Sequence, residues 1–294
     1  YLVCPYRPGL SFDREHLRAL FKYTSGVAGL PLLTYIFMRT DIFVIGKLCS
    51  PAELGLYSMA SAISQMPFHL LGAIIAPVAM PTFSAMQTDK AWINEAILHV
   101  TAAVAFVGFP LLLCAALYGK DLLLLVYGAE YTEVAGPFAI IFGTSLLQIL
   151  CIPVATLYMA IGRPELHRLF AVIRTALMLL LIYPAVKYFG LTGAAMAGLV
   201  SIALGFLFQL IRMHKITKID LRRYSFIFLR AAGISGGVAA LWLVTHNLYP
   251  DRPWLHLLPG AMGCLLAYAL TIIAFLQPKS SFSTFFTASY GKQA

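Results

Sequence analysis

Charged residues are scarce in this chain. They make up 11% of its 294 residues, whereas about a quarter is usual in soluble domains, and 60% of the residues are hydrophobic. The mean hydropathy is +0.83, and we expect the segments between the long apolar runs to be too short to fold alone. This composition excludes an ordinary soluble domain and predicts a membrane protein.

Several strings that mark catalytic or energy-coupling sites are absent. The sequence contains no G-x-x-x-x-G-K-[ST] phosphate loop, no H-E-x-x-H metal motif and no TVGYG filter string. A nucleophile elbow of the G-x-S-x-G kind is also expected to be absent. No outward loop is long enough to hold a catalytic carboxylate pair over a lipid-linked substrate. The five cysteines lack metal-ligand spacing and are interpreted as packing residues or free thiols: Cys4, Cys49, Cys114, Cys151 and Cys264. We therefore expect no enzyme, no cofactor and no metal centre.

Long apolar runs dominate what is present. Eight segments reach the roughly 20 residues that cross a bilayer. They lack the two-residue alternation of barrel strands, so the sequence predicts an all-α, polytopic membrane protein. The predicted spans are 21–46, 54–80, 93–118, 134–160, 167–188, 191–212, 225–247 and 254–276.

Basic residues are distributed unevenly around these spans. Sixteen of the 21 Lys and Arg residues fall on the side that holds both chain ends, four fall on the other side, and Arg39 lies within a span. Because Lys and Arg are retained in the cytoplasm, both termini are predicted to be cytoplasmic. The same asymmetry explains the net charge of +9 without a nucleic-acid partner. Residues 1–20 are predicted to form an amphipathic lead-in at the membrane surface.

The first span carries two charges inside it. Arg39 and Asp41 are two residues apart, so on a helix they point about 200° away from each other and cannot pair directly. Counted from a span centre near Thr34, they lie about 7 and 10 Å toward the outer face. An ionisable side chain in hydrocarbon normally faces a partner or a wet cavity. We therefore favour a cavity-facing role over simple snorkelling to the interface.

Polar residues in other spans are further candidates for a translocation path. In the second span, Gln65 and His69 are four residues apart and share a helix face, with Tyr57 close to the same stripe. They are interpreted either as lining a wet lumen or as making interhelical contacts, and Gln148 in the fourth span has the same standing. Arg174 is close enough to its span end to snorkel to the cytoplasmic interface, with contact to an anionic ligand as the alternative.

Several strings, in this order and spacing, resemble the polysaccharide exporters, the Wzx-like lipid-linked oligosaccharide flippases of the multidrug/oligosaccharidyl-lipid/polysaccharide superfamily. The resemblance covers about residues 5–215. The strings are YRPGLSFDREHLRALFKY at 6–23, RTDIFVIGKLCSPAELGLYSMA at 39–60, APVAMPTFSAMQTD at 76–89, YGAEYTEVAGPFAIIFG at 127–143, AIGRPE at 160–165 and YFGLTGAAMAG at 188–198.

The resemblance implies an architecture. Members of the superfamily have two six-helix bundles around a central cavity. By this resemblance, residues 21–214 form the second bundle, 215–276 form two additional helices and 277–294 form a cytoplasmic tail. The chain begins with Tyr1, and we expect it to be the C-terminal part of a longer protein whose first bundle is not included.

The resemblance also implies roles. Asp41 falls on the Asp of the family's D-x-x-x-I-G-like string, and Tyr57 falls on the Tyr of its L-G-x-Y pattern. Arg39 is expected to contact the anionic head of the carried lipid, and Asp41 to hold a cation or couple to an ion gradient. The implied partners are a lipid-linked oligosaccharide, membrane lipids, the first bundle, and a polysaccharide polymerase with its chain-length machinery.

The sequence thus leads to three functional hypotheses. The first is a flippase that moves undecaprenyl-diphosphate-linked oligosaccharide across the bacterial inner membrane for surface polysaccharide or O-antigen synthesis. The second is an ion-coupled drug exporter of the same superfamily. The third is an integral-membrane polysaccharide polymerase or glycosyltransferase.

Overall fold

The structure is a computed structural model that describes residues 18, 21, 24–25, 27–85 and 89–248. Within these ranges the regular structure is entirely helical, which confirms the predicted all-α class. The predicted span 254–276 and the tail 277–294 lie outside the described residues, as does the lead-in 1–20 except for Arg18. The division into a bundle and two additional helices stays a prediction.

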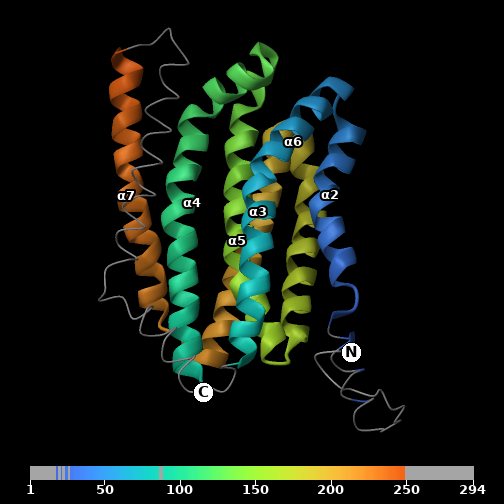
Figure 1. The fold of residues 1–294 in the computed structure, drawn as a ribbon. Helices are drawn as coiled ribbons and strands as arrows, with labels where there is room; N and C mark the ends of the chain where they lie inside the picture. The colour runs from blue at the N-terminus through green and yellow to red at the C-terminus, as the bar shows by residue number, and fades with distance from the viewer. Residues whose placement is uncertain (1–17, 19–20, 22–23, 26, 86–88, 249–294) are drawn as a thin grey trace, which may run out of the picture.

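From Leu30 to Leu248, the structure describes six α-helices and one short 3-10 helix, and successive α-helices run in alternating directions (Figure 1). The α-helices are α2 (Leu30–Leu48), α3 (Pro51–Ala85), α4 (Lys90–Tyr127), α5 (Ala135–Ala160), α6 (Pro164–Thr217) and α7 (Leu221–Leu248), and η1 (Ala129–Val134) precedes α5. Among the described residues, four helical segments are long and apolar enough to cross a membrane: α3, α4, α6 and the segment Ala129–Ala160 that contains α5. The shorter α2 and the peripheral α7 each carry three Lys, Arg or Asp residues.

Helix α6 is a hairpin of two helices. At Gly190 the backbone leaves helical geometry, with φ 55° and ψ −136°, a conformation open to glycine. The second half then runs back alongside the first (Figure 1). At Gly193 the backbones approach so closely that a Cβ atom would lie 1.9 Å from the carbonyl oxygen of Ala185. The two halves correspond to the separately predicted spans 167–188 and 191–212.

The predicted start of the first span is wrong. Gly29 adopts a left-handed conformation with φ 81°, and α2 begins only at Leu30 with Pro31 in its first turn. The helix is therefore 19 residues long, and Arg39 lies at its middle rather than about 7 Å toward one face.

The connection between α2 and α3 is fixed by a capping box. The Ser50 backbone N–H donates to a Glu53 carboxylate oxygen at 2.8 Å, and the Glu53 backbone N–H donates to the Ser50 hydroxyl at 3.2 Å. Pro51 occupies the first helical position, where its missing N–H costs nothing. This short turn holds the C-terminal half of α2 beside the start of α3.

Helix α5 is the centre of the described bundle. It packs against α3, α4 and α6, while α2 packs mainly on α6 and α7 packs on α4 at the edge (Figure 1). In the apolar window around α5, 61% of the residues are buried, whereas only 11% are buried in the corresponding window of α3. Helix α3 therefore keeps much of its surface exposed in the described part.

Candidate functional site

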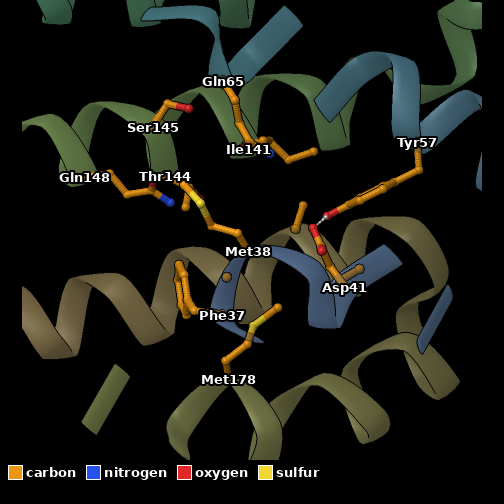
Figure 2. A pocket seen from close by; sticks show the side chains of 13 residues that line it. Phe37, Met38, Asp41, Tyr57, Gln65, Ile141, Thr144, Ser145, Gln148 and Met178 are labelled. Carbon is orange, nitrogen blue, oxygen red and sulfur yellow. Dashed lines mark hydrogen bonds between the residues drawn. The ribbon is translucent and has the colours of Figure 1, made fainter. Parts of the chain in front are cut away.

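A small polar cavity lies where α2, α3, α5 and α6 meet (Figure 2). Its polar lining comes from three of these helices and its apolar lining mostly from α2 and α6. The polar residues are Asp41, Tyr57, Gln65, Thr144, Ser145 and Gln148, and the others are Phe37, Met38, Ile141, Met178, Ala194, Ala195 and Gly198. Four of the seven residues predicted from the sequence are therefore brought to one place.

Asp41 and Tyr57 form the polar contact between α2 and α3 at this cavity. The fully buried Tyr57 hydroxyl donates to one carboxylate oxygen of Asp41 at 3.0 Å (Figure 2). The other carboxylate oxygen accepts the backbone N–H of Ile42 at 2.8 Å. Within the described residues no Lys or Arg side chain forms an ion pair with Asp41. The carboxylate is thus held in place by neutral donors.

Helix α5 supplies polar atoms with spare hydrogen-bonding capacity. The hydroxyl of Ser145 and the side-chain oxygen of Gln148 are buried and have no hydrogen-bond partner in the part of the chain that the structure describes. Thr144 donates back to the carbonyl of Ile140 at 3.1 Å. Gln148 is the one residue of this helix predicted from the sequence to line the path, although Thr144 is four residues from it and so shares its helix face.

Gln65 is already engaged on its own helix. Its side-chain N–H donates to the Ser61 hydroxyl at 2.6 Å, one turn away on α3. This contact fixes the amide at the edge of the cavity. The amide-bearing Gln65 and Gln148 thus border one cavity from α3 and α5.

The cavity is small. Its volume of about 30 Å³ is enough for about two water molecules, since one water needs roughly 10–15 Å³ measured in this way. A sugar ring or a diphosphate does not fit. In this conformation the site can hold water, a proton or a small ion, and a larger ligand requires the helices to separate or binds elsewhere.

Arg39 and His69 are not in the cavity, and both side chains are exposed in the described part. Arg39 lies about 200° around α2 from Asp41, as the two-residue spacing predicts. His69 is twelve residues after Tyr57, and four-residue steps drift by about 40° each on a 3.6-residue helix. Gln65 and His69 are about 40° apart around α3, as their four-residue spacing predicts. His69 is, however, about 120° from Tyr57, and of the two only Gln65 lines the cavity with Tyr57.

Arg174 does not snorkel, and that prediction is wrong. Its side chain is 8% exposed and donates to the Thr34 hydroxyl on α2 at 3.1 Å. The guanidinium carbon lies 4.8 Å from the centre of the Phe37 ring and 5.2 Å from that of Phe170. The neighbouring Thr175 hydroxyl donates to the Leu33 carbonyl at 3.2 Å. Because α2 packs on α6, it covers Arg174. The guanidinium therefore contacts aromatic faces and a hydroxyl acceptor instead of extending to the membrane interface.

Residues 233–237 spell G-x-S-x-G, the pattern of a nucleophile elbow, so the expectation that this string is absent is wrong. The elbow requires a sharp strand-to-helix turn. Ser235 instead lies inside α7, is buried, and donates to the Ala231 carbonyl at 2.8 Å. The string therefore does not have the geometry of a catalytic serine. No group of three metal-ligating side chains occurs within the described ranges.

Comparison with known proteins connects this bundle to polysaccharide export. A family described as "Polysaccharide biosynthesis protein" matches residues 1–136. The lipopolysaccharide biosynthesis protein WzxC of Escherichia coli strain K12 is 24% identical over 202 residues, which is 69% of this chain and 39% of that protein. The teichuronic acid biosynthesis protein TuaB of Bacillus subtilis strain 168 is 24% identical over 55% of this chain and 33% of its own length.

Two further relatives are named as flippases. The probable low-salt glycan biosynthesis flippase Agl15 of Haloferax volcanii is 22% identical over 64% of the chain and 40% of that protein. The solved structure of the lipid II flippase MurJ, in an inward closed conformation, matches with a TM-score of 0.68 at 13% identity, covering 92% of this chain and 57% of the other.

The chain therefore spans 39% or less of the length of the first two curated relatives and a little over half of the solved flippase. These matches confirm the resemblance to the Wzx-like polysaccharide exporters that the sequence motifs indicated, in a multi-pass membrane protein whose helices share the fold of a lipid flippase.

Proposed function

We propose that the protein moves undecaprenyl-diphosphate-linked oligosaccharide across the bacterial inner membrane, for surface polysaccharide or O-antigen synthesis, by alternating access. The observation that carries this proposal is a polar cavity with a half-buried carboxylate, enclosed by membrane helices whose fold is that of a lipid flippase. A sugar-diphosphate head cannot cross hydrocarbon unaided. A bundle that opens to each side in turn removes that barrier while the lipid tail stays in the bilayer.

The relatives support the substrate class. Their names refer to lipopolysaccharide, teichuronic acid and a low-salt glycan, and one of them is called a flippase. These glycans differ from one another. We therefore transfer the class of substrate, a glycan assembled on a lipid, and no particular sugar.

Within this function we assign Asp41, Tyr57, Gln65 and Gln148 to the response of the bundle to a small occupant. The cavity admits about two water molecules, so the sugar head does not share it in this conformation. Gain or loss of water, a proton or a small cation beside Asp41 changes the electrostatic cost of the closed arrangement. This biases the packing of α2 against α3, α5 and α6.

The membrane and the partners follow from the same proposal. We place the protein in the inner membrane with the Ile161–Arg163 turn and the start of α7 in the cytoplasm, because basic residues concentrate at that end. The first of the two six-helix bundles in the superfamily's architecture completes the central cavity. A polysaccharide polymerase with its chain-length machinery consumes the translocated lipid.

The test is translocation by the purified protein in proteoliposomes. Fluorescent undecaprenyl-diphosphate oligosaccharide is placed in both leaflets, and the fraction protected from a membrane-impermeant quencher is followed over time. We expect protein-dependent exchange between the leaflets. Failure of exchange, with efflux of cationic drugs driven by a proton or sodium gradient, would replace this function with the drug exporter.

Deletion of the gene separates flipping from polymerisation. Loss of export with accumulation of single lipid-linked repeats on the cytoplasmic side supports the flippase. Normal export with an altered polymer length supports the polymerase or glycosyltransferase instead.

A further inference from the structure

A buried cation lies just beyond the wall of the Asp41 cavity. The side chain of Arg174 is 8% exposed, and within the described residues no Asp or Glu forms an ion pair with it. It donates a hydrogen bond to the Thr34 hydroxyl at 3.1 Å, while its buried Nε has no hydrogen-bond partner in the same part of the chain. A buried guanidinium without an anion is costly, so this arrangement stores free energy that a counter-charge would release.

Asp41 lies on the same face of α2 as the Thr34 acceptor. The two residues are separated by two helical turns, which is about 10 Å along the axis and about 20° around it. The Asp41 carboxylate lines the cavity and accepts hydrogen bonds from two neutral donors, the Tyr57 hydroxyl and the Ile42 backbone N–H. The bundle therefore holds a carboxylate and a guanidinium two turns apart along α2 without pairing them.

The ring of Phe37 separates the two charges. Phe37 is 4% exposed, lies on α2 between Thr34 and Asp41, and its ring centre is 4.8 Å from the guanidinium carbon. The same ring lines the cavity, as does Met178, which is one turn beyond Arg174 on α6 (Figure 2). Each of the two helices thus places an apolar side chain between the guanidinium and the cavity that holds the carboxylate.

We propose that Phe37 is a gate and that Arg174 is a positioning residue for Asp41: when the ring leaves its place, the guanidinium and the carboxylate form an ion pair across the cavity. The aromatic contact holds the cation in the closed arrangement, and the ion pair stabilises the alternative one. The cavity has room for about two water molecules and provides the polar path between the two groups. The inference rests on the proposed flippase function, to which it adds the internal charge pair that distinguishes two arrangements of the bundle.

The first test measures the coupling between the two charges with and without the gate. D41N, R174Q and the double variant are compared by unfolding in mixed micelles, in the unmodified protein and in an F37A background. With Phe37 in place, we expect a coupling of about twofold or less in the unfolding equilibrium constant. Removal of the ring by F37A is expected to raise this coupling by about tenfold, because the two groups then form a close pair.

Phe83 provides the matched control background. It is as deeply buried as Phe37, on α3, but does not line the cavity. F83A is therefore expected to leave the coupling between Asp41 and Arg174 unchanged. Equal coupling in the unmodified and F37A backgrounds would overturn the gate. An equal rise in the F37A and F83A backgrounds would also overturn it, since loosened packing would then explain the effect.

The second test observes the carboxylate directly. Subtracting the infrared spectrum of D41N from that of the purified protein isolates the carboxylate band of Asp41, and the same subtraction is made in each background. F37A is expected to shift this band, R174Q to abolish the shift, and R174K, which keeps the charge, to preserve it. A structural role of Arg174 alone would not change the band. A shift that persists in F37A/R174Q would overturn the pairing.

The two levels of inference fail differently. If the unmodified protein moves no lipid-linked sugar, the proposed function fails, while the coupling and the infrared band still test the charge pair. If it does move lipid-linked sugar, and F37A changes neither the coupling nor the band, the function stands and the gate is wrong.

Discussion

The most informative contact at the scale of single residues joins the Tyr57 hydroxyl to the Asp41 carboxylate at 3.0 Å. It borders the same cavity as two buried oxygens of α5, on Ser145 and Gln148, that have no hydrogen-bond partner within the described residues. A buried polar atom without a partner costs free energy, so such atoms persist where water, an ion or a change of state uses them. This cluster is therefore where a small chemical change has the largest structural effect.

We predict that Asp41→Asn lowers the initial rate of lipid-linked oligosaccharide translocation by about tenfold or more, while the protein still inserts and folds. The variant keeps the shape of the side chain but removes its charge. Tyr57→Phe is expected to have a smaller effect in the same direction because it leaves the charge in place. The exposed carboxylate variant Glu133→Gln is the control. Normal transport by Asp41→Asn would assign Asp41 a purely structural role.

A second prediction concerns Arg174 and Thr34. Loss of the hydroxyl in Thr34→Val leaves the buried guanidinium with one acceptor fewer, which destabilises the α2–α6 contact. In a cycle with Arg174→Met, we expect a coupling free energy of about 0.6–1.7 kcal/mol, the range of hydrogen bonds between membrane helices. Unfolding in mixed micelles measures it. Additive effects of the two substitutions would show that the contact contributes nothing.

At the scale of elements, the hairpin of α6 decides the shape of the site. Its first half contributes Met178 and its second half Ala194, Ala195 and Gly198 to the same cavity. The small residues of the second half leave room beside α2 and α5. The cavity therefore exists only because the chain reverses at Gly190 and returns at close range.

We predict that Gly193→Ala destabilises the folded protein by about 3 kcal/mol or more, because its Cβ would meet the Ala185 carbonyl at 1.9 Å. Neither backbone can retreat without opening the hairpin. Gly136→Ala is the matched control, since a Cβ there meets nothing within 4 Å. Thermal stability in detergent provides the measurement, and equal melting temperatures for the two variants would contradict the tight turn.

At the scale of the whole molecule, the alternating helix directions sort the connections onto two ends (Figure 1). The Ile161–Arg163 turn and the α6–α7 connection lie at one end. The α2–α3 turn, η1 and the Gly190 turn lie at the other. Basic residues concentrate at the first end, which gives the orientation a physical basis.

We predict that a cysteine at position 163 reacts with a membrane-impermeant maleimide only after the cells are opened. A cysteine at position 133 is expected to react in intact cells. The reverse pattern would invert the topology. Reaction of both positions in intact cells would contradict a membrane crossing by α5, which connects them.

The sequence determined which long apolar helices form in the described part, where most of them turn, and which family the chain resembles. Hydrocarbon imposes this pattern on each helix separately, because every backbone group must be satisfied within it whatever its neighbours are. Two features of the site could also be predicted because each depends on one helix alone. They are the string around Asp41 and the shared face of Tyr57 and Gln65.

Only the tertiary structure decided which way the polar residues face. In a membrane helix all sides are apolar enough to meet either lipid or protein, so hydropathy does not distinguish them. Packing of α2 on α6 buried Arg174, and the same packing turned Arg39 outward and Asp41 inward. The rotation of successive side chains around α3 places His69 outside the cavity, and the packing of α5 against α3 adds Thr144 and Ser145 to its lining. These positions could not be predicted from single helices, because a cavity is formed by the space between helices.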